Sequence, residues 1–182
     1  MNTLLSHLSQ RSVDGASFRS ISPGTKGPSV RRLQQDLNYR LSALGVLDTI
    51  SVQVDGWFGP DTAVVVKYLQ CVGGLPVNGY VDCSTQAFIQ QGEAGLSQLS
   101  LGSVAVGVLA LKQVLSSTTG LPLVRDNQFC VQTEWAVMIF QQSLGLKRDG
   151  VVGTKTWQEI VQLRLNTLPC AAVLPDAALL GT

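Results

Sequence analysis

The sequence predicts a mainly α fold made of two tandem three-helix bundles, with an N-terminal and a C-terminal arm. Three observations support this fold class: an internal duplication, apolar residues that recur every three or four positions, and the lack of a convincing pair of strands. We expect an N-terminal arm (1–21), a first repeat (22–90), a linker (91–99), a second repeat (100–165) and a C-terminal arm (166–182).

Two blocks of the chain recur with constant spacing. In the first block the separation is 78 residues, and Gly24, Val30, Leu33 and Leu37 recur as Gly102, Val108, Leu111 and Leu115. In the second block it is 71 residues, and Asp55, Phe58, Thr62, Leu69, Gln70, Gly74, Leu75, Gly79 and Thr85 recur as Asp126, Phe129, Thr133, Phe140, Gln141, Gly145, Leu146, Gly150 and Thr156. The difference places a seven-residue insertion in the first copy, within residues 45–54. Two separations that each hold over many positions indicate a duplication.

Each repeat contains three predicted helices. The first helix of the first repeat begins at Pro28, because proline is favoured at the first helical position. The second helix of that repeat has Asp61 in its first turn, where an acid suits the helix dipole. The third helix is short and begins near Ser84 in the first repeat and near Thr154 in the second, where Trp157 starts an apolar stripe and is expected in the core. Asn-Gly or Asp-Gly turns precede these helices at residues 55–56, 78–79 and 149–150.

Four large residues of the second helices lie beside the main apolar stripe, namely Val64, Tyr68, Trp135 and Ile139. They could widen the core of each bundle, form an interface between the repeats or with a partner, or line a ligand platform. Domains of about 60 residues are marginally stable alone, so we expect the two repeats to pack closely.

Length, composition and charge exclude several classes of protein. The 182 residues are enough for one medium domain or two small ones, and 45% hydrophobic residues can form a core. With 13 Lys and Arg against 12 Asp and Glu, the net charge of +1 argues against a nucleic-acid partner. No apolar run approaches the roughly 18 residues of a membrane span, and the start of the chain lacks the basic segment of a signal peptide.

At the duplicated positions the chain resembles the peptidoglycan-binding domain family, a three-helix module attached to many bacterial cell-wall hydrolases. The family pattern begins G-x-x-G-x-x-V-x-x-L-Q-x-x-L, which the first repeat matches at Gly24, Gly27, Val30, Leu33, Gln34 and Leu37. The middle part, D-G-x-F-G-x-x-T-x-x-A-V-x-x-F-Q, is matched there at Asp55, Gly56, Phe58, Gly59, Thr62 and Gln70. The second repeat matches the last part, G-L-x-x-D-G-x-V-G-x-x-T-W, at Gly145, Leu146, Asp149, Gly150, Val152, Gly153, Thr156 and Trp157.

Each repeat departs from this pattern in one half. The first has Asn78, Asp82 and Gln86 where the family has Asp, Gly and Trp, and the second has Asn127 and Cys130 in place of glycines. Such complementary departures are expected if the two repeats work as one unit. They leave open the loss of sugar or peptide binding from one repeat.

The resemblance implies non-catalytic binding of peptidoglycan, by a cell-wall-binding protein or targeting module located in the wall, in the periplasm or outside the cell. The alternative is a structural or docking component of a large assembly, a phage virion or a contractile injection machine, with protein subunits as partners. The missing signal-peptide pattern favours the alternative, because virion proteins reach the wall from outside. We also expect the apolar C-terminal arm, with Pro169 and Pro175, to lie along its own bundles or along a neighbouring subunit.

No group of residues predicts catalysis. The only histidine, His7, lies in the N-terminal arm, which excludes a His-rich zinc site and a Ser–His or Cys–His pair in the repeats. We therefore expect no enzyme activity, no cofactor and no metal site. Cys71 and Cys83 are close enough in sequence for a disulfide, but reduced thiols are the default for a chain without a signal peptide. Cys130 takes a glycine position and is expected to be a small buried residue.

The candidate ligand-binding residues are those that could meet sugar or peptide near the turns: Trp57, Tyr80, Asp55, Tyr39, Arg40 and Gln70. Trp57 and Tyr80 take the free positions of two turns, although Trp57 could equally cap the insertion as part of the core. Arg40 lies off the apolar stripe, where a solvated face is the simpler interpretation. Gln70 and Gln141 are expected to bond the backbone near the turns.

Overall fold

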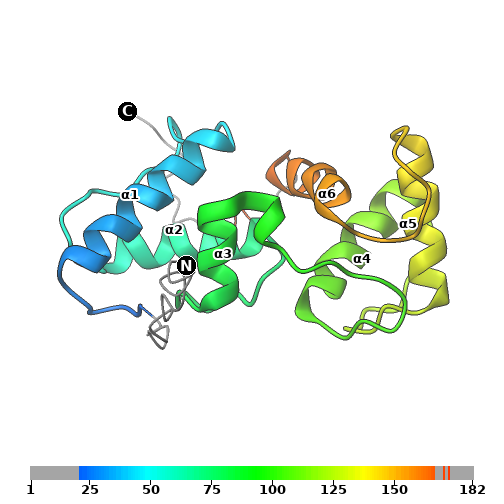
Figure 1. Cartoon of the computed structure of the whole chain (residues 1–182), viewed down its shortest axis with the longest axis horizontal. Coiled ribbons are helices and arrows are strands. Elements are labelled where there is room, and N and C mark those ends of the chain that lie inside the picture. Colours follow the sequence, from blue (N-terminus) through cyan, green and yellow to red (C-terminus); the bar gives the residue numbers. More distant parts are fainter. Residues whose placement is uncertain (1–20, 167–169, 171, 173–182) are drawn as a thin grey trace, which may run out of the picture.

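The computed structural model describes residues 21–166, 170 and 172, which form two helical bundles side by side (Figure 1). The first bundle contains α1 (Pro28–Ala43), α2 (Pro60–Val72) and α3 (Cys83–Gln91), and the second contains α4 (Val106–Thr119), α5 (Val131–Ser143) and α6 (Thr154–Asn166). Within the described residues the β pairing is limited to isolated bridges. The prediction of two tandem, mainly α, three-helix bundles is therefore confirmed.

The short segment between the bundles is packed rather than extended. Its first residues form a 3-10 helix, η1 (Gly92–Gly95), which contacts both α3 and α6. The two predicted arms lie mostly outside the described residues. The predicted contacts of the C-terminal arm therefore fall mostly outside them too. In the described part of the chain, no helix is both long enough and apolar enough to cross a bilayer.

The apolar stripes form one core that continues through both bundles. Leu37 and Phe58 are completely or almost completely buried in the first repeat, and so are their counterparts Leu115 and Phe129 in the second. Trp157 is buried too, as its place in the apolar stripe predicts. The duplicated sequence thus produces two equivalent sets of core contacts.

The residues beside the stripe differ between the repeats. In α2, Tyr68 is buried and Val64 packs against the core, so these two residues widen it. In α5, Trp135 is 59% exposed. The difference follows from position, because α2 reaches the centre of the molecule whereas α5 lies at its outer end (Figure 1).

A segment before the first helix of each repeat joins that repeat's two turns. In the first repeat, Ile21 pairs with Val81 and Lys26 pairs with Trp57 through isolated bridges. In the second repeat, residues 99–104 do the same, since Leu99 pairs with Val152 and Val104 with Gln128. Two turns that are distant in sequence are thereby held along one edge of each bundle.

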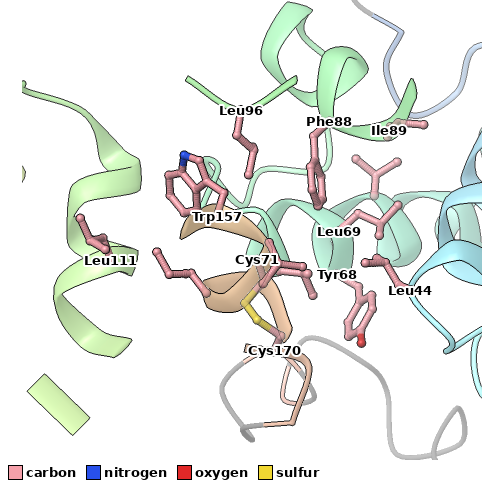
Figure 2. Close-up of a cluster of buried hydrophobic side chains, with 14 of the residues drawn as sticks. Leu44, Tyr68, Leu69, Cys71, Phe88, Ile89, Leu96, Leu111, Trp157 and Cys170 are labelled. Carbon is pink, nitrogen blue, oxygen red and sulfur yellow. A yellow bond between two sulfur atoms is a disulfide. The ribbon is translucent and has the colours of Figure 1, made fainter. Parts of the chain in front are cut away.

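The two bundles meet at the end of α2. Gly73 and Gly74 line a small space there together with Leu96 and Trp157, and the Trp157 indole lies next to Leu96 (Figure 2). The indole Nε1 donates to the Ser97 carbonyl at 2.9 Å. The turn after α2 thus packs against the second repeat.

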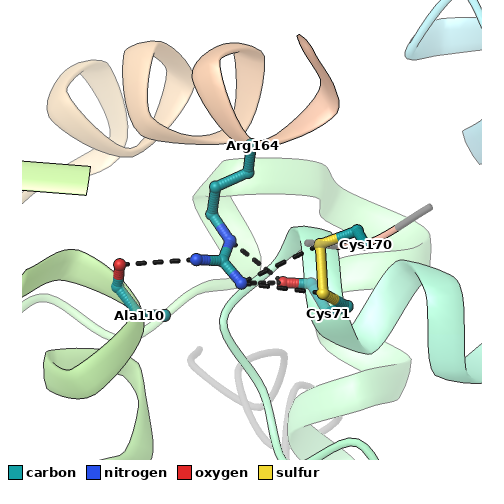
Figure 3. The surroundings of a disulfide bond; sticks show 4 residues. All are labelled: Cys71, Ala110, Arg164 and Cys170. Carbon is teal, nitrogen blue, oxygen red and sulfur yellow. Dashed lines mark hydrogen bonds between the residues drawn. A yellow bond between two sulfur atoms is a disulfide. The ribbon is translucent and has the colours of Figure 1, made fainter. Parts of the chain in front are cut away.

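A buried arginine and a disulfide join the repeats at the same place (Figure 3). Arg164 in α6 donates from Nη2 and Nε to the carbonyl of Cys71, at 2.8 and 3.1 Å. Cys71 also forms a disulfide with Cys170, 99 residues away, with their Cα atoms 5.6 Å apart. The default of reduced thiols is therefore wrong for Cys71, and Cys83, its possible partner from the sequence, is a free, exposed cysteine. At Cys170 the C-terminal arm is attached to the first repeat.

Candidate ligand-binding surface

Four turns carry the polar residues of the repeats, and three of them are built around a buried glutamine. In the turn after α2, Gln70 Oε1 accepts the backbone N–H groups of Asn78 and Gly79, at 3.0 and 2.9 Å. Its Nε2 donates to the Tyr80 carbonyl at 2.8 Å and to Thr85 Oγ1 at 3.1 Å. Gln141 makes the same set of contacts in the second repeat, with residues 149–151 and 156.

In the turns before α2 and before α5, a buried polar side chain of the first helix of the repeat takes this role, but its residue type differs between the repeats. Gln34 Oε1 accepts the N–H of Gly56 at 2.8 Å, and its Nε2 donates to Asp55 and to the Trp57 carbonyl. Lys112 takes the place of this glutamine in the second repeat and contacts Asp126. The sequence analysis missed Gln34 and Lys112 as turn residues. The signal was present, because a threonine follows seven residues after the Asn or Asp in all four turns.

These contacts correct one candidate. Gln70 is 1% exposed, and each of its polar atoms is already bonded within the turn. It has no atom available for a sugar or peptide, so its role is to hold the turn. The expectation that Gln70 and Gln141 bond the backbone near the turns is correct.

Arg40 is also placed differently from expectation. Its side chain is buried instead of solvated, and Nε donates to the Ile89 carbonyl at 3.0 Å, near the end of α3. The guanidinium also lies 6.0 Å from the ring of Phe88, a cation–π distance. Arg40 therefore joins α1 to α3, because a cation near a helix C-terminus satisfies carbonyls that have no partner in the helix.

The aromatic candidates are on the surface. Trp57 is 45% exposed, Tyr80 is 50% exposed and Tyr39 is 72% exposed. Trp57 and Tyr80 belong to the two turns that residues 21–26 hold together, whereas Tyr39 lies farther along α1. The structure thus places two of the three aromatic candidates on the two turns that one segment bridges.

Asp55 is exposed beside Trp57, where its carboxylate is part of the turn. Oδ1 accepts the N–H of Trp57 and the Nε2 of Gln34, both at 2.8 Å. The hydrogen bond from the Trp57 N–H, and then that from Gln34, lower the pKa of Asp55 below its ordinary value. Asp55 is therefore an ionised residue that shapes the turn.

A cleft of about 780 Å³ opens beside Trp57, between the Asp55–Trp57 turn and the first turns of α1. Lys26, Arg31 and Arg32 line it and are all exposed. The sequence analysis did not select these three residues as ligand-binding candidates. Only the fold brings Lys26 and the α1 arginines to the same side of Trp57.

The comparisons with known proteins agree with this arrangement. A family model described as "Putative peptidoglycan binding domain" matches residues 26–89 and again residues 105–160. No curated protein and no solved structure matches the chain. The two matched segments cover more than half of the chain, one in each bundle. The chain therefore belongs to the peptidoglycan-binding domain family, of which it contains two tandem copies.

Proposed function

We propose that this protein binds peptidoglycan without modifying it, through the edge of the first repeat that carries Trp57 and Tyr80. The observation that carries the proposal is the exposure of these two aromatic rings, on two turns that residues 21–26 bridge, in a peptidoglycan-binding domain. Aromatic faces bury the apolar faces of sugar rings and peptide groups at a small cost in conformational entropy. Asp55 shapes this edge, and Tyr39 is a separate candidate farther along α1.

The state of the turn carboxylates supports binding without catalysis. A glycoside hydrolase needs one carboxylic acid with a raised pKa as the proton donor. The pKa of Asp149, in contrast, is lowered, chiefly by the hydrogen bond from the Val151 N–H. The pKa of Asp126 is also lowered, chiefly by its hydrogen bond with Lys112. Both carboxylates therefore stay ionised near neutral pH, because the turns hydrogen-bond to the charged form.

The experiment is sedimentation with purified, insoluble sacculi. The wild type should pellet with the sacculi, and a Trp57→Ala/Tyr80→Ala variant should pellet at least about tenfold more weakly, because two stacking faces are lost. Trp135→Ala is the matched control, since Trp135 is a similarly exposed aromatic residue of the other repeat. Equal pelleting of the wild type and the double variant would refute this site, and the release of soluble fragments would refute non-catalytic binding.

The disulfide supports a location outside the cytosol, in the wall, in the periplasm or on a particle that reaches the wall. Disulfides persist in oxidising compartments and are rare in the cytosol. The bond joins Cys71 and Cys170 at a buried position between the repeats. Such a location matches a ligand that lies outside the cell membrane.

A docking role in a larger assembly is the second candidate. Val131 and Trp135 lie one turn apart on the outer helix α5, and both are more than half exposed. Exposed apolar residues grouped in this way are typical of protein interfaces. If the wild type does not pellet with sacculi, a docking role becomes the better explanation, and Trp135→Ala should then weaken incorporation into the assembly.

A further inference from the structure

The cleft beside Trp57 has a strong excess of positive charge. Three cations line it, Lys26, Arg31 and Arg32, and Asp55 is the one acid among the lining residues. The N-terminus of α1 adds to this charge, because Gly27 and Pro28 line the cleft and the first turn has neither an acidic residue nor a side-chain cap. The positive end of the helix dipole is therefore not neutralised locally.

The cations are arranged around the indole of Trp57. Lys26 Nζ lies 5.7 Å from the centre of the Trp57 ring. Arg31 is fixed by donating to the carbonyls of Val54 and Asp55, at 2.9 and 3.2 Å. Among the residues that the structure describes, none forms a hydrogen bond or ion pair with the exposed Arg32 side chain. The cleft thus combines an aromatic face with a fixed cation and two available ones.

The second repeat lacks the charged residues of this cleft. Its residues at the positions of Lys26, Arg31, Arg32 and Trp57 are Val104, Leu109, Ala110 and Gln128. The first turn of its first helix, α4, is in addition covered by the turn after α2, where Ala105, Val106 and Gly107 line the narrow space shared with Gly73 and Gly74. In the second repeat the positions of Lys26 and Trp57 are also exposed but carry the uncharged Val104 and Gln128, and the position of Arg32 is the buried Ala110. Packing alone therefore does not account for the charges of the first repeat.

We propose that this cleft binds a free carboxylate of the peptidoglycan stem peptide, with Lys26 and Arg32 pairing with the carboxylate and Trp57 contacting the adjoining sugar or peptide. This inference rests on the proposed function and assigns peptide recognition to the first repeat. Carboxylates prefer a cationic, hydrogen-bonding environment, and a cleft of about 780 Å³ is the size of a small-ligand site. The second repeat then acts as a support for the first.

The test compares Lys26→Gln/Arg32→Gln with the matched control Arg148→Gln/Lys155→Gln in the sacculus assay. Each variant removes two exposed positive charges, from the first and the second repeat respectively. Arg31 is left unchanged, because it holds the backbone of the insertion. We expect the cleft variant to bind at least about tenfold more weakly and to lose most of the salt dependence of binding, and the control to bind like the wild type.

Two treated substrates identify the anion. Sacculi stripped of phosphate-containing wall polymers should still bind the wild type, and stripped sacculi whose free carboxylates have been converted to amides with a carbodiimide and ammonia should not. Equal binding by the cleft variant and the wild type would overturn the carboxylate site while leaving peptidoglycan binding intact. Retained binding to the amidated sacculi, or loss of binding with the phosphate polymers, would also overturn it. Absence of wild-type binding to any sacculi would contradict both proposals.

Discussion

The ammonium group of Lys112 lies 2.6 Å from the carboxylate of Asp126, where the other three turns have a glutamine. Lys112 is almost completely buried, whereas the Asp126 side chain is partly exposed. A buried ammonium group needs a charged or hydrogen-bonded partner, because its transfer from water is costly. In this turn an ion pair therefore replaces the amide contacts of the others.

This pair predicts a dependence of stability on pH. The hydrogen bond from Lys112, and then that from the Gln128 N–H, lower the pKa of Asp126 in the folded state. The contribution to stability is therefore present above the unfolded value of about 3.9 and is lost as the pH falls through the lower, folded pKa. We expect Asp126→Asn to be less stable than the wild type at pH 7, and the difference to shrink in urea titrations below pH 4.

Asp48→Asn is the control for that experiment. Asp48 is exposed in the insertion, and its carboxylate has no hydrogen bond with any of the described residues. The Asp48→Asn substitution should leave the pH dependence of the free energy of unfolding unchanged. A constant difference between Asp126→Asn and the wild type from pH 7 to pH 2 would contradict the role of the ion pair.

The buried glutamines predict a large loss of stability on truncation. In Gln70→Ala the N–H groups of Asn78 and Gly79 lose their acceptor, and the Tyr80 carbonyl loses its donor. Unsatisfied buried polar groups of this kind should lower the free energy of unfolding by about 2–3 kcal/mol. Gln142→Ala, at an exposed position of α5, should change it by less than about 0.5 kcal/mol. Similar denaturation midpoints for the two variants would contradict this account of the turns.

Reduction of the disulfide should destabilise the protein. The Cys71–Cys170 bond closes a loop of 99 residues, and a loop of that length contributes about 3–5 kcal/mol by restricting the unfolded chain. We expect a reductant, or Cys71→Ser, to lower the melting temperature clearly. Cys83→Ser should have little effect, since Cys83 is free and exposed. A melting temperature that does not respond to reductant would show that the bond does not form in solution.

The contact between the repeats can be tested at a pair of equivalent glycines. Gly74 and Gly145 both have positive φ, 66° and 67°, so alanine is strained at either position. At Gly74 an added Cβ would also lie 3.0 Å from Ala110 Cβ, whereas at Gly145 it would meet nothing within 4 Å. Gly74→Ala should therefore cost about 1–2 kcal/mol more than Gly145→Ala in chemical denaturation. Equal costs would show that the turn after α2 does not pack on α4.

The sequence by itself determined the elements that depend on neighbouring residues. The duplication predicted two bundles because apolar residues three and four positions apart must share one face of a helix. Proline at the start of α1 and α2, and glycine after Asn or Asp in three of the turns, set the limits of the helices through backbone geometry. The exposure of Trp57 and Tyr80 followed from their free positions in the turns, although burial of Trp57 in the core was an equal alternative.

The tertiary structure decided the contacts between distant residues. Arg40 looked solvated from its place on α1, but it is buried because α3 ends against it. Cys71 has Cys83 as its near neighbour in sequence, yet it pairs with Cys170 because α6 brings the end of the second repeat to the end of α2. The cationic cleft likewise needs the segment before α1 to pair with the turn at Trp57. Helical periodicity specifies which face of each helix is apolar, but the packing of helices and turns on one another, within and between the bundles, decides which polar residues are enclosed and which remain open to a ligand.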